Sequence, residues 1–293
     1  MNANPVGTID RDAHEQNRRS WNAVTPAHNS HKQNQAEFFR SGGSTLFPEE
    51  IELVGDIAGK RLVHLQCNCG QDTLSLAQLG AEVVGVDISD AAIGTARQLS
   101  VDSGIPATFH RADLFDWFTE AKEQGEQFDI VFASYGAICW LSNLNRWADG
   151  ITGILKPGGR FALVEFHPTL QGLGEDWTPE YPSIEGKRQV YTEGIGDYVG
   201  MMGEILAPSG FEAGVTEFEN PESVIEFAWS LGDVATALLE AGLILRVVRE
   251  YPYSNGYTPF SGFKELPGKR FTMPDDRALI PMMYGVVAEA PGG

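Results

Sequence analysis

From Gly59 onward the sequence alternates short apolar runs with stretches of helical periodicity, and this alternation constrains the fold most. Strands that alternate with helices in this way form βαβ units, so the pattern predicts an α/β domain with a doubly wound, seven-stranded, mostly parallel sheet. The strands are expected at Arg61–Gln66, Glu82–Asp87, Thr108–Ala112, Asp129–Ser134, Arg160–His167, Leu243–Tyr253 and Met282–Ala288.

Helices are expected between these strands. The clearest are predicted at Gln71–Leu79, Asp90–Ser103, Leu144–Leu155 and Trp229–Ala241. The run Lys156-Pro157-Gly158-Gly159 predicts a tight turn before the fifth strand, because proline and glycine favour turn geometry.

The polar residues 1–50 are expected to form an N-terminal helical arm that covers the main domain, residues 51–293. Within the arm we predict a short helix over Asp12–Asn22, a loop over Thr25–Gly43, and a second helix near Gln33–Arg40. Residues 168–220 break the strand and helix alternation with glycine, proline and aromatic residues. Because long loops in compact domains usually have a function, this segment is interpreted as a substrate-side insertion after strand five.

Composition limits the possible partners. The 293 residues carry a formal net charge of −19, which repels phosphate backbones and argues against a nucleic-acid partner. No apolar stretch is long enough to cross a membrane, and the polar start does not resemble a signal peptide, so a soluble cytoplasmic protein is expected. Three cysteines without a fourth ligand predict no metal site. Nothing in the composition fixes the oligomeric state.

The segment Val63–Asp72 is the strongest indication of a binding site. It has the pattern of an apolar strand that ends in a turn and opens directly into a helix, which is where ligands bind in such sheets. Asp87 ends the next strand, roughly 20 residues on, where a carboxylate is able to accept the hydroxyls of a ribose. The order of strand, turn, helix, strand and acid favours a cofactor that contains a nucleoside.

The residues of the turn discriminate between cofactors. Dinucleotide and phosphate sites need glycines that let a diphosphate approach the backbone. Here Gln66 and Asn68 stand at two of the candidate glycine positions, only Gly70 remains, and no lysine follows. S-adenosylmethionine has no phosphate, so polar side chains in this turn are able to bind its amino acid end instead.

The chain resembles the class I S-adenosylmethionine-dependent methyltransferases over about residues 60–167 and the last two strands. The resemblance is carried by Leu62–Gly70 in the first strand and the turn that follows it, Asp87, the run Arg111-Ala112-Asp113-Leu114, and the turn Leu155–Gly159. It departs from the family pattern at Gln66 and Asn68, and at His64, where the family usually has an acid.

This resemblance implies a Rossmann-like methyltransferase fold and S-adenosyl-L-methionine as the cofactor. It places Gly70 near the methionine part, Asp87 on the ribose, Asp113 on the adenine amine, and Ser134 and Tyr135 beside the sulfonium. The full set of expected cofactor-binding residues is Gln66, Cys67, Asn68, Gly70, Asp72, Asp87, Ile88, Ala112, Asp113, Leu114, Ser134 and Trp21.

Methyl transfer mainly requires the reactants to be aligned and desolvated, so a base is optional. Where the acceptor needs one, the catalytic candidates are His167, Tyr135 and His28, with Glu165 and His31 as further options. Trp21 and His28 of the arm are also expected to help close the site. A wall of aromatic residues is available to hold a planar or cationic acceptor: Trp140, Trp177, Tyr181, Tyr198, Trp229 and Tyr257.

The leading function is therefore methyl transfer to a small organic molecule, at oxygen or nitrogen ahead of carbon. Two other functions stay open: a nicotinamide-dependent oxidoreductase on a similar sheet, and a cofactor-binding regulatory protein without catalysis. Structural roles also stay open, since Asp87 would serve as a cap for the turn at Ser89, and His167 as a strand-terminal residue before Pro168.

Overall fold

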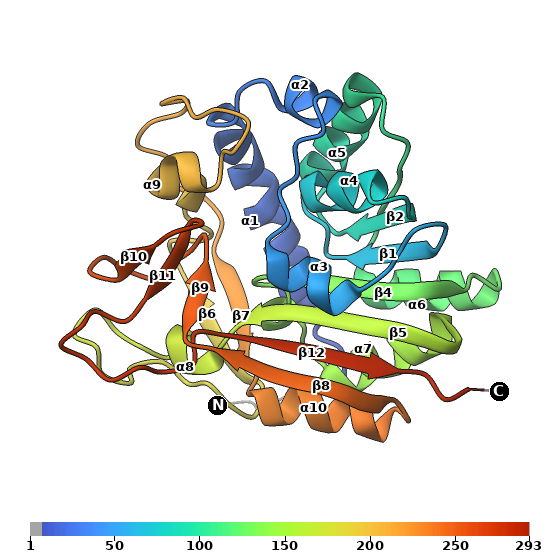
Figure 1. Ribbon diagram of the computed structural model, residues 1–293. Coiled ribbons are helices and arrows are strands. Elements are labelled where there is room, and N and C mark those ends of the chain that lie inside the picture. Colours follow the sequence, from blue (N-terminus) through green and yellow to red (C-terminus); the bar gives the residue numbers. More distant parts are fainter. Residues whose placement is uncertain (1–7, 293) are drawn as a thin grey trace.

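A computed structural model describes residues 8–292 and has a seven-stranded sheet in the order β3-β2-β1-β4-β5-β12-β8 (Figure 1). The strands are β1 (Arg61–Leu65), β2 (Glu82–Asp87), β3 (Thr108–Arg111), β4 (Phe128–Ser134), β5 (Leu155–Phe166), β8 (Ile244–Tyr251) and β12 (Met283–Glu289). Neighbouring strands from β3 to β5 pair in parallel, whereas β12 pairs antiparallel with both β5 and β8. The predicted doubly wound, mostly parallel sheet is thus confirmed.

Helices cover both faces of this sheet, and each face buries its own apolar cluster (Figure 1). One face packs against α6 (Leu114–Glu123), α7 (Leu144–Ile154) and α10 (Leu231–Glu240). The other packs against α3 (Pro48–Val54), α4 (Gln71–Gln78) and α5 (Asp90–Ser103), with α2 (Gln35–Arg40) lying on α5. The nearly unbroken apolar runs of the central strands reflect burial on both faces.

The helix α1 (Arg11–Ser30) is longer than the sequence predicts. A short helix followed by a loop from Thr25 was expected, but the helix continues through Pro26 to Ser30. Proline removes one backbone donor, a cost that tertiary contacts outweigh here. The side chain of Asn17 exchanges two 2.8 Å hydrogen bonds with the backbone of Ile225.

At its other side α1 is fixed to the sheet domain. Asn22 Oδ1 accepts hydrogen bonds from Ser89 Oγ at 2.7 Å and from the backbone N–H of Ala91 at 3.2 Å. Arg18 forms an ion pair with Asp90. The helix therefore connects the start of α5 with the strand that contains Ile225, and the predicted boundary of the arm at residue 50 falls inside α3.

Two excursions extend beyond the carboxyl ends of the parallel strands, on the same side of the molecule (Figure 1). The first follows β5 and contains α8 (Pro168–Gln171), β6 (Lys187–Tyr191), α9 (Tyr198–Met202), the 3-10 turn η2 (Gly203–Ile205) and β7 (Val224–Ala228). The antiparallel pairing of β6 with β7 carries this excursion beyond the predicted end at residue 220.

The second excursion was not predicted. It separates β8 from β12 and forms a small sheet of β9 (Tyr253–Asn255), β10 (Lys264–Leu266) and β11 (Arg270–Thr272). The single strand expected over Leu243–Tyr253 therefore ends as β8 at Tyr251, and β9 begins at Tyr253. The predicted Pro-Gly-Gly turn is an irregularity at the start of β5, where Gly158 has φ 71° and the pairing with β4 shifts register.

Within residues 8–292, no helix is long and apolar enough to span a membrane. The same part of the chain contains no group of three or more His, Cys, Asp or Glu side chains placed to hold a metal ion.

Candidate functional site

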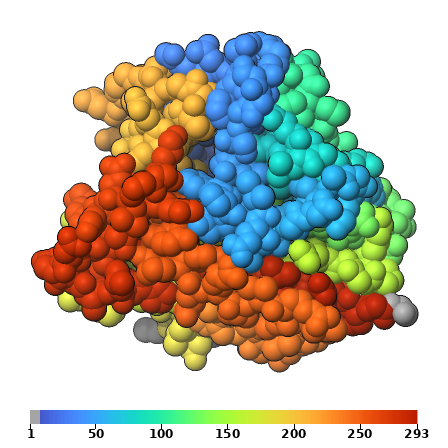
Figure 2. Space-filling model, viewed as in Figure 1, coloured from blue at the N-terminus to red at the C-terminus, as the bar shows by residue number. Residues whose placement is uncertain are grey.

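A cavity of about 1140 Å³ lies at the carboxyl ends of β1, β2 and β4. It reaches from the sheet to α1 and to both excursions, and Figure 2 shows the surface hollowed where the blue, gold and red segments meet. In this strand order the direction of winding reverses at β1 and β4, and such a switch point is where open α/β sheets bind ligands. The cavity is therefore the candidate functional site.

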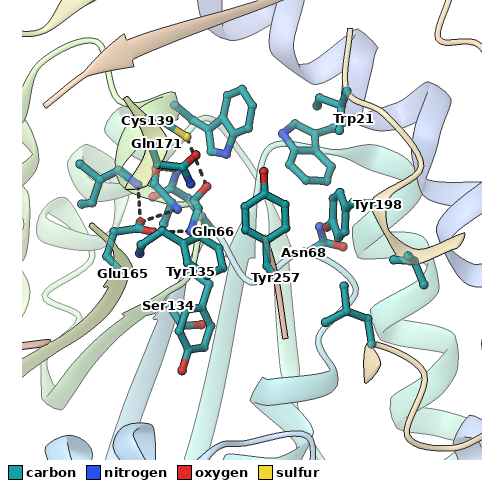
Figure 3. Close-up of a pocket in the computed structure, with 18 of the residues that line it drawn as sticks. Trp21, Gln66, Asn68, Ser134, Tyr135, Cys139, Glu165, Gln171, Tyr198 and Tyr257 are labelled. Atoms are coloured by element: carbon teal, nitrogen blue, oxygen red, sulfur yellow. Dashed lines mark hydrogen bonds between the residues drawn. The ribbon is translucent and has the colours of Figure 1, made fainter. Parts of the chain in front are cut away.

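The turn after β1 adopts a left-handed backbone at alternate residues. Gln66 has φ 54°, Asn68 has φ 48° and Gly70 has φ 75°. Left-handed conformations favour glycine, so the turn keeps the geometry of a glycine-rich loop although only one glycine remains. At Asn68 a local hydrogen bond offsets part of the cost of this left-handed backbone, since its Oδ1 accepts the N–H of Cys69 at 2.6 Å. Figure 3 shows the side chains of Gln66 and Asn68 at the cavity.

Asp87 lies at the end of β2, directly beside this turn. Its Oδ2 accepts the N–H of Asn68 and its Oδ1 accepts the N–H of Ser89, each at 2.8 Å. Burial raises the pKa of the carboxyl, and these backbone donors act in the opposite direction. Because each carboxylate oxygen has a second lone pair, both are still able to accept from a ligand in the cavity. The capping contact with Ser89 is thus present, and the carboxylate also lines the cavity.

Gly70 begins α4 but does not line the cavity. A Cβ at this position would lie 2.8 Å from the ring of Phe109 and 2.9 Å from Cβ of Ala96. The glycine is therefore required by packing beneath the turn and by its positive φ. The expected direct contact of Gly70 with the methionine part has no support in the cavity geometry.

Two polar side chains beside the turn have unusual surroundings. Gln66 donates through Nε2 to the carbonyl of Ala137 at 2.9 Å, and its Oε1 is buried without a hydrogen-bond partner in the described part of the chain. Lys32, which sequence reasoning missed, lies in the cavity lining. Burial lowers the pKa of its ammonium, and the nearby Cys69 and Asp72 oppose that shift. Lys32 follows α1, so its place over the turn depends on long-range packing.

At the end of the cavity beside α6, residues of α1 contact Asp113. Asp113 caps α6 by accepting the N–H of Phe115 at 2.9 Å; it also forms an ion pair with Arg11 and accepts a hydrogen bond from His14 Nδ1 at 2.7 Å. These partners lower the pKa of the Asp113 carboxyl, against the effect of burial. Nδ1 of His14 faces the carboxylate, and Nε2 is buried at the cavity without a partner among residues 8–292.

The segment after β4 is held by Glu165, at the end of β5. The Glu165 carboxylate accepts backbone N–H groups of Gly136, Ala137 and Ile138. Figure 3 shows Glu165 with dashed hydrogen bonds at its carboxylate. Burial raises the pKa of Glu165, whereas these backbone donors lower it. Since the carbonyl of Ala137 in turn accepts from Gln66, Glu165 fixes the wall of the cavity rather than offering a free base.

The three predicted catalytic residues have different surroundings. His167 lies outside the cavity lining: Nδ1 accepts the N–H of Thr169 at 3.1 Å to cap α8, and Nε2 lies 3.0 Å from Glu250 Oε1. Its expected catalytic role is thus replaced by a capping role. Tyr135 does line the cavity, and its hydroxyl accepts a hydrogen bond from Nδ2 of Asn255 at 2.8 Å. Burial keeps the Tyr135 pKa well above its ordinary value, so it stays a phenol.

His28 lines the cavity from α1 and its Nε2 donates to the carbonyl of Gly196 at 3.1 Å. Burial lowers its pKa to about 4, which leaves a neutral and weakly basic imidazole. Trp21 lies two turns earlier on the same helix, with its ring 5.7 Å from that of Trp140. His31 is paired with Asp197 at 2.7 Å and lies outside the lining.

The remaining expected cofactor residues all line the cavity: Cys67, Asp72, Ile88, Ala112, Leu114, Ser134 and Trp21. The aromatic wall is also largely present, formed by Trp140, Tyr181, Tyr198, Trp229 and Tyr257. Figure 3 shows Tyr257 projecting between the Gln66 side and the Trp21 and Tyr198 side. Trp177 instead packs outside the cavity lining against Phe260 and Phe263.

Comparisons with known proteins agree with this architecture. Residues 63–159 match the protein family described as a methyltransferase domain. The ubiquinone biosynthesis O-methyltransferase of Chelativorans sp. is 27% identical over 156 residues, which cover 53% of this chain and 60% of that protein. An uncharacterised methyltransferase of Synechocystis sp. is 34% identical over 129 residues, which cover 43% of this chain and 57% of that protein. The chain thus spans less than two thirds of these curated relatives.

Among solved structures, the 4+2 cyclase SpnF matches the fold with a TM-score of 0.55 at 13% identity, over 100% of both chains. At this identity the match concerns the fold alone, and it shows that this architecture is not restricted to one reaction. The strand order, the turn after β1 and the matched segment lead to one conclusion. The chain resembles the class I S-adenosylmethionine-dependent methyltransferases in the order of its sheet and, over residues 63–159, matches a methyltransferase domain in sequence.

Proposed function

We propose that the protein transfers a methyl group from S-adenosylmethionine to an oxygen or nitrogen atom of a small organic molecule, with carbon ranked below these. The observation that carries the proposal is the pairing of Asp87 with the left-handed turn at Gln66–Gly70 at the edge of the large cavity. When bound, S-adenosylmethionine supplies an electrophilic methyl group on a sulfonium. The protein has to hold and align the two reactants and exclude water.

The methionine end of the cofactor fits the groups beside the turn. Lys32 is a partly buried cation that no carboxylate within residues 8–292 contacts directly, and it is available to bind the cofactor carboxylate. The unpartnered Oε1 of Gln66 is an acceptor for the cofactor ammonium. These two side chains would do what backbone groups alone do in a turn built only of glycines.

The adenosine end fits the crevice between β2 and α6. The Asp87 carboxylate is expected to accept the ribose hydroxyls, and Ile88, Ala112 and Leu114 supply apolar walls for the base. Asp113 was expected to accept from the adenine amine. Because its oxygens are engaged by Arg11, His14 and a backbone N–H, the free Nε2 of His14 is the better placed acceptor.

The acceptor is expected to be a small molecule because the aromatic residues enclose the remaining part of the cavity. The O-methyltransferase named for ubiquinone biosynthesis supports an organic acceptor of this size. The net charge of −19 argues against nucleic acid. The cytoplasmic location expected from the sequence stays a prediction.

Binding of S-adenosylhomocysteine and of NADH tests the cofactor assignment. We expect S-adenosylhomocysteine to raise the melting temperature of the protein and NADH to leave it unchanged. The reverse result would favour the oxidoreductase alternative. Catalysis is tested by incubating the protein with S-adenosylmethionine and a metabolite panel, and by searching for products heavier by one methylene. Cofactor binding without any such product across a broad panel would favour a regulatory protein.

A further inference from the structure

We infer that the methyl acceptor carries a positively charged amine and that Glu226 is the residue that binds it. This inference rests on the proposed function and adds a substrate class to it. The methylated atom itself remains oxygen or nitrogen, because the amine serves here to hold the acceptor in place.

Glu226 lies on β7, in the first excursion, and lines the acceptor side of the cavity. Its neighbours on the strand, Ile225 and Phe227, pack with Ala13 of α1. The Glu226 side chain itself lines the cavity, together with Val224 and Phe227 of the same strand. The carboxylate therefore reaches the space where an acceptor would lie, opposite the segment after β4.

The carboxylate of Glu226 has no partner within residues 8–292: no side chain there forms an ion pair or a hydrogen bond with it. Three other carboxylates that line the cavity are occupied. Asp87, Asp113 and Glu165 each accept two or more backbone or side-chain donors. Glu50 also has one unpartnered oxygen, but its second oxygen accepts the N–H of Phe47 to cap α3. Glu226 is thus the one acid of this set left wholly for a ligand.

The groups that face Glu226 come from three other elements and carry no charge at neutral pH. They are Cys139 after β4, Tyr191 on β6 and Tyr257 of the second excursion, and burial raises the pKa of each. Its ladder partner on β6 is Gln189, which accepts from the hydroxyl of Tyr191. Burial of the unpaired carboxyl raises its own pKa to about 7. A bound cation would relieve the cost of burying this charge.

The surroundings favour a cation over other ligands. Aromatic ring faces attract ammonium groups, and Tyr191, Tyr257 and Trp140 line the same side of the cavity. The two lysines of the cavity are placed elsewhere: Lys32 lies near Asp72 and Cys69, and Lys269 donates to the carbonyl of Glu204. An anionic acceptor group would meet an unpaired carboxylate without a compensating cation.

The test compares phenethylamine, which is a cation at neutral pH, with its neutral counterpart phenethyl alcohol. Both are titrated by calorimetry into the full chain loaded with S-adenosylhomocysteine. We expect phenethylamine to bind at least about tenfold more tightly than the alcohol. Its affinity should rise from about pH 6 to about pH 8, because the carboxylate ionises in this range while the amine stays protonated.

Two variants complete the test. Glu226→Gln should lower the affinity for phenethylamine at least about tenfold, remove its pH dependence, and leave the alcohol unaffected. Glu219→Gln removes a carboxylate of the same excursion outside the cavity lining and should bind both probes as the wild type does. Equal affinity of the wild type for the two probes, absence of binding by both, or an unchanged Glu226→Gln variant would overturn the inference.

The experiments distinguish failure of the amine site from failure of the cofactor assignment. If S-adenosylhomocysteine binds but phenethylamine shows no preference, the amine site is wrong while the cofactor assignment stands. If S-adenosylhomocysteine itself does not bind, the proposed function fails first. The comparison of the two probes on the wild type needs no variant, so it decides the inference even where the Glu226→Gln protein folds poorly.

Discussion

Replacement of Asp87 by alanine gives the most direct test of the cofactor site. The carboxylate accepts two backbone N–H groups at 2.8 Å and lines the cavity, where it is accessible to a ligand. Hydrogen bonds from ribose hydroxyls to a carboxylate are worth about 1–3 kcal/mol in total after desolvation. We therefore expect Asp87→Ala to weaken binding of S-adenosylhomocysteine by roughly 5- to 150-fold.

The same change also affects folding, and the two effects have to be measured separately. Alanine leaves the N–H groups of Asn68 and Ser89 without their acceptor, at a cost of about 1–3 kcal/mol for each that water cannot reach. Calorimetric titration gives the dissociation constant, and urea denaturation without ligand gives the free energy of unfolding. Asp87→Asn keeps one acceptor oxygen and should lie between wild type and Asp87→Ala in both measurements.

A suitable control is Asp102→Ala, which removes an exposed carboxylate at the end of α5 that accepts from Gln98. This variant should bind S-adenosylhomocysteine within about twofold of the wild type. If Asp87→Ala binds equally well under conditions where it is folded, the carboxylate does not contact the ribose and the assignment of the crevice is wrong.

Three further predictions concern other parts of the site. Lys32→Met should weaken S-adenosylhomocysteine about tenfold and leave adenosine binding unchanged in calorimetry, because only the former has a carboxylate; equal losses would contradict this role. Gly70→Ala should destabilise the fold by about 2–4 kcal/mol in urea denaturation through its positive φ and contact with Phe109, whereas Gly94→Ala, which meets no atom within 4 Å, should be neutral or stabilising; similar effects of both would refute the packing argument. Burial raises the pKa of Glu226 from 4.5 to about 7, so the folded protein is most stable when this carboxyl is protonated, and that stability is lost as the pH rises through this range. Without ligand, Glu226→Gln should therefore exceed the wild type in free energy of unfolding by about 2–3 kcal/mol near pH 8 and resemble it near pH 5. A difference that does not change with pH would contradict the buried charge.

The sheet was predictable because its information is local. Each expected strand matches an observed one within a few residues, since apolar runs bounded by turn signals identify buried strands. The small sheet of β9–β11 escaped detection because its strands have three residues each, too short for a periodic pattern. The extent of α1 escaped because Pro26 argues locally for a break, and only contacts with β7 and α5 offset it.

The site was predictable where the residue and its neighbours follow from the strand order. Asp87, Asp113 and Ser134 end strands or begin helices at one edge of the sheet, and all three line the cavity. His14, Lys32 and Glu226 could not be identified in this way. They come from α1, its extension and the β6–β7 hairpin, and their positions depend on contacts between segments up to about 200 residues apart. The prediction of a catalytic role for His167 rested on its position at the end of a strand. That position does not reveal that its ring points to Glu250.

The placement of α1 has a consequence for how the two reactants are accommodated. The same helix carries His14 and Asn22 against the proposed nucleoside crevice and Asn17 and His28 against the excursion beside the proposed acceptor site. If a ligand at one of these surfaces fixes the position of α1, the other surface is ordered with it, and thermodynamic reciprocity makes that effect equal in both directions. We therefore expect the methyl acceptor to bind more tightly once the cofactor occupies its crevice.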